Sequence, residues 1–199
     1  SCLREKRIPA VAAGTTLKDR LFTWTDVDRY AGFAEATRCL VLEGHTRIVL
    51  LDIDPGVYSK AKITAFLRTL SEETGQEATN AVVRASVLGF EETVAVTERL
   101  LARPAGPPEA ILLTDNFYAE AVLHVLRHHR VRPGPDCRII GFGETDLADR
   151  CVPRISHYDL RVADQVTFCL EALLAEIQDP AAFTPRQQVL VPRYIRRET

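Results

Sequence analysis

The chain has 199 residues, of which 46% are hydrophobic and 26% are charged, and its formal net charge is −2. These values are ordinary for one globular domain or a pair of small lobes, and they give no overall basic charge of the kind that favours nucleic acid. No apolar run approaches the roughly 20 residues that cross a bilayer, and the N-terminus has no apolar signal segment. We therefore expect a protein that is neither secreted nor inserted in a membrane.

The cysteines favour a reduced, cytoplasmic compartment. Their number is odd, their positions are scattered and no Cys-x-x-Cys pair occurs, so neither a disulfide framework nor a zinc site is indicated. The five positions are Cys2, Cys39, Cys137, Cys151 and Cys169. The sequence also contains no methionine, so we expect it to be part of a longer protein.

The first elements in chain order are a strand, a loop, a helix and a buried strand. Residues 8–14 form a short apolar run that ends in Gly14, which predicts a strand, and residues 15–24 are expected to form a polar loop. From Asp28 to Gly44 apolar residues recur every three or four positions, which predicts a helix. Residues 47–53 are almost continuously apolar, which suits a strand that is covered on both faces.

The alternation of helix and strand continues to the end of the chain. Helices are predicted at 61–73, 91–102, 116–130 and 162–177, and strands at 81–87, 110–114, 137–142, 155–158 and 189–196. Repeating βα units of this length are typical of an α/β fold with a doubly wound parallel sheet. Ligands in such folds bind beyond the carboxyl ends of the strands.

Signatures of cofactor binding or nucleophilic catalysis are missing from the sequence. Gly141-Phe142-Gly143 lacks the third glycine of a dinucleotide loop, and neither a GxxxxGK[ST] loop nor a GxSxG elbow occurs. The carboxylate pairs Asp52/Asp54 and Glu91/Glu92 could serve acid–base chemistry, but pocket lining or solvated turns explain them equally well. We therefore expect no cofactor and no enzymatic activity.

Two histidines, His124 and His128, lie four residues apart on a predicted helix. This spacing could bind a metal ion if a carboxylate or cysteine joined them. The alternative is that they sit in the last turns of the helix, where cations are favoured by the helix dipole. Because no further ligand is visible, we expect no metal site.

Local motifs along nearly the whole chain match one family in the same order. These motifs are Ile8-Pro9-Ala10-Val11, Asp28-Arg29-Tyr30-Ala31-Gly32, Gly44-His45-Thr46-Arg47-Ile48, Ala65-Phe66, Gly89-Phe90-Glu91-Glu92, Thr114-Asp115-Asn116, Ile139-Ile140-Gly141-Phe142, Pro153-Arg154-Ile155-Ser156-His157-Tyr158, Val189-Leu190-Val191-Pro192 and Arg197-Glu198-Thr199. Together they resemble the effector-binding domain of the lactose-repressor (LacI/GalR) family.

The resemblance implies a periplasmic-binding-protein-like fold of type I, with two doubly wound parallel-sheet lobes. About three βα units and a DNA-binding helix-turn-helix would precede Ile8, so the first lobe is expected to be incomplete. We expect residues 1–43 plus 151–188 to form the incomplete lobe. Residues 44–150 plus 189–199 are then expected to form the complete lobe.

The function implied by the resemblance is the sensing of a small, sugar-like effector in the cleft between the lobes of a homodimeric regulator. Effector binding would change the affinity of the upstream helix-turn-helix for operator DNA. One alternative is a periplasmic solute-binding protein of a sugar transporter, which has the same fold. Another is an α/β enzyme that uses Asp115 and Glu144 as acid and base.

The expected ligand-binding residues lie at strand ends or early helical turns. They are Asp28, Ser59, Lys62, Phe90, Asp115, Asn116 and Glu144. Simpler roles remain open, since Asp28 could cap a helix, Phe90 could belong to the core and Lys62 could be solvated.

Four positions depart from the family pattern in the expected binding site. Lys62 stands where the family has an arginine, and Gly143 where it has an aspartate. The Asn-Asp pair of the family is reversed as Asp115-Asn116. Because lysine lacks the bidentate fork of arginine, we expect weak binding of neutral hexoses and better binding of another sugar or a sugar acid.

Overall fold

The computed structural model describes residues 3, 6, 8–14, 22–52, 59–75, 81–84 and 89–199. The chain forms two compact units, and each is assembled from two separate stretches of sequence. The first unit contains Ser1–Asp28 and Leu160–Pro192, and the second contains Arg29–Asp159 and Arg193–Thr199. Among the described residues, no helix combines the length and the apolar character needed to cross a membrane.

The second unit is built on a sheet with the strand order β4-β3-β5-β6-β7-β9. All neighbouring strands are parallel except β7 and β9, which are antiparallel. The strands are β3 (Ile48–Asp52), β4 (Val82–Arg84), β5 (Ala110–Leu113), β6 (Arg138–Gly143), β7 (Ser156–Asp159) and β9 (Arg193–Ile195). Every residue of β3, β5 and β6 is buried, as expected for parallel strands that helices cover on both faces.

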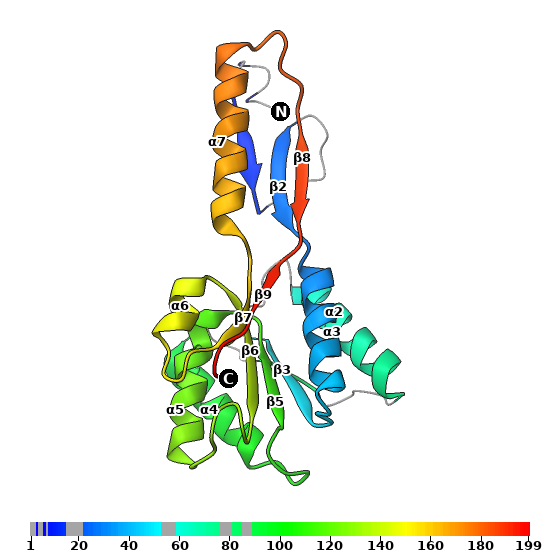
Figure 1. Ribbon diagram of the computed structural model, residues 1–199, viewed down its shortest axis with the longest axis vertical. Helices are drawn as coiled ribbons and strands as arrows, with labels where there is room; N and C mark the ends of the chain where they lie inside the picture. Colours follow the sequence, from blue (N-terminus) through cyan, green and yellow to red (C-terminus); the bar gives the residue numbers. More distant parts are fainter. Residues whose placement is uncertain are drawn as a thin grey trace. The chain divides into compact units, whose positions relative to one another are not determined.

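Helices cover both faces of this sheet (Figure 1). On one face, α4 (Phe90–Leu101) and α5 (Ala119–His128) pack over alternate strand residues such as Leu51, Ile111 and Ile139. The opposite face carries α2 (Arg29–Leu42), which is packed against α3 (Ser59–Thr74). There the Phe33 ring stacks on Phe142 with ring centroids 3.8 Å apart, and Phe142 stacks in turn on Tyr158. The period-two alternation of the strands thus separates two apolar layers.

The first unit has a smaller sheet with the order β1-β2-β8, and its strands are all parallel. These strands are β1 (Val11–Ala13), β2 (Thr23–Val27) and β8 (Gln187–Leu190), and α7 (Val162–Gln178) packs on β1 and β2. The backbone N–H of Ala10 donates to the Glu176 carboxylate of α7 at 3.2 Å. Only Gln165 and Ala172 of α7 are buried, whereas its apolar residues Leu170 and Leu174 are exposed.

The expected α/β class with parallel sheets is confirmed, but three elements differ from the sequence prediction. Strand β2 begins inside the expected loop 15–24, and helix α6 (Thr145–Arg150) occupies a stretch for which we predicted no element. The expected strand 189–196 is two strands, β8 and β9, which pair in different sheets. Val191 and Pro192 separate them, and proline cannot donate a hydrogen bond to a sheet ladder.

The unit boundaries also differ from the expected ones. We expected residues 29–43 and 151–159 in the first lobe, and residues 189–192 in the second. The structure groups α2 with the second unit because its buried face, including Phe33 and Leu40, packs on α3 and the second sheet. It likewise groups β7 there because β7 pairs with β6, and it groups β8 with the first unit because β8 pairs with β2.

Candidate functional site

Polar side chains gather at the carboxyl edge of the second sheet. The register pairs Leu51 with Leu113 and Leu112 with Ile140, so β3, β5 and β6 end at the same edge. Asp52 ends β3, Asp115 and Asn116 follow β5, and Glu144 follows β6. Neighbouring strands lie about 4.8 Å apart, which brings these residues into one region of the second unit.

Asn116 and Glu144 are brought together directly. The Asn116 side-chain amide donates to the backbone carbonyl of Glu144 at 3.1 Å. Asn116 is buried, and within the described chain its Oδ1 has no hydrogen-bond partner. A Cβ atom built on Gly141 would lie 1.9 Å from this oxygen, so only glycine at position 141 leaves room for Asn116.

Asp115 and Glu144 differ in how much of each carboxylate the local structure uses. Asp115 accepts a hydrogen bond from the backbone N–H of Phe117 at 2.8 Å and so caps the short 3₁₀ turn η1 (Asn116–Tyr118). Glu144 occupies the N-cap position of α6, but its side chain makes no capping hydrogen bond, and the residue is exposed. The Glu144 carboxylate is therefore available to another hydrogen-bond donor.

Asp52 is a residue of this edge that the sequence analysis did not place among the binding residues. Its side chain is almost fully buried, and Oδ2 accepts a 2.6 Å hydrogen bond from the Ser59 hydroxyl. The Arg84 guanidinium lies 3.5 Å from the same oxygen, whereas Oδ1 lacks a partner within the described chain. The sequence signal was the carboxylate pair Asp52/Asp54, of which Asp54 lies outside the described residues.

The other predicted residues take different places. Ser59 and Lys62 lie one turn apart on α3, and both are buried. Phe90 begins α4 and is 51% exposed, with its ring centroid 5.9 Å from that of His124. Asp28 belongs to the first unit, where its backbone N–H donates to Leu190. A site that combines Asp28 with the other six residues stays a prediction.

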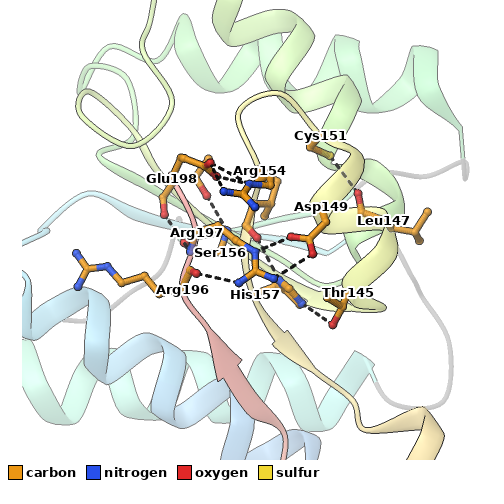
Figure 2. A network of polar contacts seen from close by, with 12 residues as sticks. Thr145, Leu147, Asp149, Cys151, Arg154, Ser156, His157, Arg196, Arg197 and Glu198 are labelled. Carbon is orange, nitrogen blue, oxygen red and sulfur yellow. Dashed lines mark hydrogen bonds and ion pairs between the residues drawn. The ribbon is translucent and has the colours of Figure 1, made fainter.

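A network of polar contacts connects α6, β7 and the C-terminal segment Arg193–Thr199, called the tail below (Figure 2). The Ser156 backbone N–H donates to the Thr199 hydroxyl at 2.9 Å, and that hydroxyl donates to the Ile139 carbonyl at 2.9 Å. The Ser156 hydroxyl donates to the Thr199 carbonyl. Arg197 forms a bidentate pair with Asp149 at 2.5 and 3.0 Å, which lowers the pKa of the Asp149 carboxyl.

His157 joins the same network from inside β7. Its Nδ1 lies 3.1 Å from the Ile155 carbonyl, and its Nε2 lies 3.1 Å from the Thr145 hydroxyl. Burial lowers the pKa of His157, because the charged imidazolium would lose its hydration. The sequence motifs Ile155-Ser156-His157 and Arg197-Glu198-Thr199 marked these positions, but no role was assigned to them.

The histidines of α5 do not gather further metal ligands. Across the described ranges, no group of three or more His, Cys, Asp or Glu side chains is arranged to hold a metal ion. His129, which follows α5, instead pairs with Glu98 at 2.5 Å, and His124 lies near the Phe90 ring.

Proteins with an open parallel α/β sheet bind small molecules in the crevice beyond the carboxyl ends of the strands, which is the edge where these polar residues lie. Residues 37–199 match the family model described as a periplasmic binding protein-like domain. Because this match covers most of the sequence, the chain belongs to that family, in the form of a LacI/GalR effector-binding domain.

Three known proteins illustrate the similarity. The HTH-type transcriptional regulator AglR of Rhizobium meliloti (strain 1021) is 29% identical over 140 residues, which are 69% of this chain and 39% of AglR. A LacI-family regulatory protein from Chloroflexus aggregans superposes with a TM-score of 0.84 at 26% identity, covering 99% of this chain and 70% of that one. A LacI-family regulator from Enterococcus faecium with bound ribose shares the fold, with a TM-score of 0.83 at 17% identity, covering 98% and 72%. This chain therefore spans about two-fifths of the length of AglR.

Proposed function

We propose that the chain is the effector-sensing core of a DNA-binding transcriptional regulator and that a sugar-like small molecule binds at the carboxyl edge of the second sheet. The observation that carries the proposal is the juxtaposition of Asn116, Glu144 and Asp52 at that edge, within a LacI/GalR-type domain. The regulators with which the chain shares its fold support sensing over transport and over catalysis. The protein is accordingly proposed to be cytoplasmic and not an enzyme.

The chemistry of the edge suits a ligand rich in hydroxyl groups. The carboxylates of Asp52, Asp115 and Glu144 accept hydrogen bonds, and the hydroxyl of Ser59 both donates and accepts. Lys62 would supply a cation, and Phe90 an apolar ring face. A buried acceptor that remains unpaired destabilises the protein by roughly 1–3 kcal/mol. A ligand hydroxyl that donates to the Asp52 Oδ1 atom would remove this cost and so stabilise the complex.

The partners follow from the same proposal. Operator DNA would be bound by a helix-turn-helix in another part of the protein, and two copies of the regulator would form a homodimer. Effector binding would favour one of two conformations of the dimer and thereby change its affinity for DNA. The HTH-type name of AglR supports this assignment.

Calorimetric titration of the full-length protein against pentoses, hexoses and uronic acids tests the proposal. We expect micromolar binding of at least one pentose or uronic acid and weaker binding of glucose and galactose. Glu144→Gln and Asp115→Asn should weaken that binding about 10- to 100-fold, the factor that corresponds to one lost charged hydrogen bond. Glu171→Gln, which removes an exposed carboxylate of α7, is the matched control and should bind as the wild type does. Failure of the whole panel to bind, or unchanged binding by both site variants, would contradict the proposal.

A further inference from the structure

Helix α6 is short and has little apolar packing to hold it. It contains six residues, of which only Ala148 is buried. It also follows Gly143, whose φ of 127° lies in the region that favours glycine, so the chain bends between β6 and α6. Since isolated helices of this length are not stable in water, α6 depends on its other contacts for its position.

The first of these contacts lies at the start of α6. The Ile155 carbonyl can only accept, so the Nδ1 atom of His157 carries the proton that is donated to it. In a neutral imidazole the other nitrogen is then an acceptor, and the Thr145 hydroxyl donates to Nε2. The hydrogen bond from the Thr145 hydroxyl to His157 therefore connects the start of α6 to β7.

The second contact lies at the last turn of α6. Arg197 donates two hydrogen bonds to the Asp149 carboxylate, and both side chains are partly buried, with exposed fractions of 23% and 35%. Arg197 is itself held, because its backbone N–H donates to the Ser156 hydroxyl at 2.9 Å. The tail cannot easily shift, since Thr199 is buried and bonded to both β6 and β7.

We propose that His157 and Arg197 are positioning residues of the effector site, which hold α6 at its two ends and so keep Glu144 against Asn116. The proposal rests on the proposed function for the ligand-binding role of Glu144. Neither residue needs to touch the effector. His157 acts through Thr145, and Arg197 acts through Asp149.

The test compares variants that release α6 with one that loosens the tail elsewhere. Thr145→Val removes the hydroxyl while keeping the shape of the side chain, and Arg197→Ala removes the pair with Asp149. Arg154→Ala is the control, because Arg154 donates to both carboxylate oxygens of Glu198 in the tail and makes no hydrogen bond to α6, although its charge acts on Asp149. Thr145→Ser restores the hydroxyl and should behave as the wild type does.

Amide hydrogen exchange of the full-length protein supplies the first readout. We expect exchange across residues 144–150 to rise roughly 10-fold in Thr145→Val and Arg197→Ala, as expected when about one hydrogen bond to a charged or buried group is lost. Exchange in β5 should stay unchanged, which shows that the variants are folded. Unchanged exchange across residues 144–150 in both variants, or an equal rise in Arg154→Ala, would overturn the proposal.

Titration with D-ribose and with D-glucuronate supplies the second readout. We expect the Kd of whichever sugar binds to rise about 10-fold in Thr145→Val and Arg197→Ala and to stay unchanged in Arg154→Ala and Thr145→Ser. A faster exchange of α6 without any change in Kd refutes the role in effector binding. If neither sugar binds the wild type, the sugar of the panel that does bind is titrated in their place. If no sugar of the panel binds, the proposed function is contradicted, and the exchange result alone decides whether these residues position α6.

Discussion

A single methyl group at position 141 would collide with Asn116. The added Cβ atom would lie 1.9 Å from Oδ1 and 3.2 Å from Cγ, so the Asn116 side chain would have to leave its place. We expect Gly141→Ala to lower the free energy of unfolding by about 1–3 kcal/mol, the usual cost of overpacking a well-filled interior. Urea unfolding measures this loss.

The double variant Gly141→Ala with Asn116→Ala provides the control for this prediction. It removes the colliding atoms, so its loss of stability should be smaller than the sum of the losses in the two single variants. Strict additivity would show that the glycine is needed for another reason.

The residues of the candidate site were easier to predict from the sequence than the contacts that they make. Asp115, Asn116 and Glu144 were predicted from the family resemblance and from their positions after parallel strands, and the structure brings Asn116 and Glu144 into contact. Asp52 was not assigned to the site, since a buried aspartate cannot be distinguished by pattern from one in a solvated turn. The hydrogen bond between Thr145 and His157 joins side chains that are 12 positions apart in the sequence. The periodicity of polar and apolar residues carries no information about such a bond.

The Glu109 side chain joins the beginnings of β3 and β5. Its carboxylate accepts from the backbone N–H groups of Thr46 and Arg47 at 2.8 and 3.1 Å, and from the Thr46 hydroxyl at 3.0 Å. These hydrogen bonds hold the pKa of Glu109 at about 2, well below its ordinary value of 4.5. Because the folded state favours the carboxylate, this contribution to stability is complete above pH 4.5 and is lost as the pH falls towards 2.

Glu109→Gln should therefore cost stability at neutral pH and little in acid. We expect a loss of about 1–2 kcal/mol at pH 7, the lower part of the range for charged hydrogen bonds because the side chain is partly exposed. The difference from the wild type should shrink between pH 4.5 and pH 3, as measured by urea unfolding at each pH. Glu171→Gln, at an exposed position in the middle of α7, should show no such trend. A loss that is constant over this pH range would argue against the hydrogen-bonded carboxylate as its source.

The elements that sequence patterns missed are those with an atypical balance of polar and apolar residues. Strand β2 reads Thr-Trp-Thr-Asp-Val, and two of its buried residues are threonines rather than aliphatic residues. The Thr23 hydroxyl accepts from the backbone N–H of Arg186, so a distant segment makes its burial possible. Helix α6 is less than two turns long, too short for helical periodicity to be recognised.

The two units differ in the size of their cores. The second unit carries a sheet of six strands with helices on both faces, whereas the described part of the first has three strands and α7. We expect the amides of α7, β1 and β8 to exchange with solvent faster than those of β3, β5 and β6, because fewer buried apolar contacts oppose local opening. Hydrogen exchange of the intact protein at neutral pH checks this order. Equal protection in the two units would show that they open only together.

The sequence predicted the α/β class but placed the unit boundaries differently from the structure. The apolar face of α2 shows that the helix must pack on something, yet Phe33 and Leu40 carry no information about which sheet they cover. The division follows from strand pairing, in particular β7 with β6 and β8 with β2, and these are contacts between distant parts of the chain. The pattern of a single strand is compatible with either partner.

The chain passes between the units at three places, after Asp28, after Asp159 and after Pro192. The crossings after Asp159 and after Pro192 lie next to each other, because Asp159 pairs with Arg193 between β7 and β9 and accepts a 3.2 Å hydrogen bond from the Arg193 side chain. A single recombination event in the gene therefore cannot exchange one unit for that of a relative. Three junctions must be cut and rejoined together, and two of them must preserve the pairing of β7 with β9. The second unit is therefore difficult to transfer between genes by itself, and we expect the two units to be inherited together.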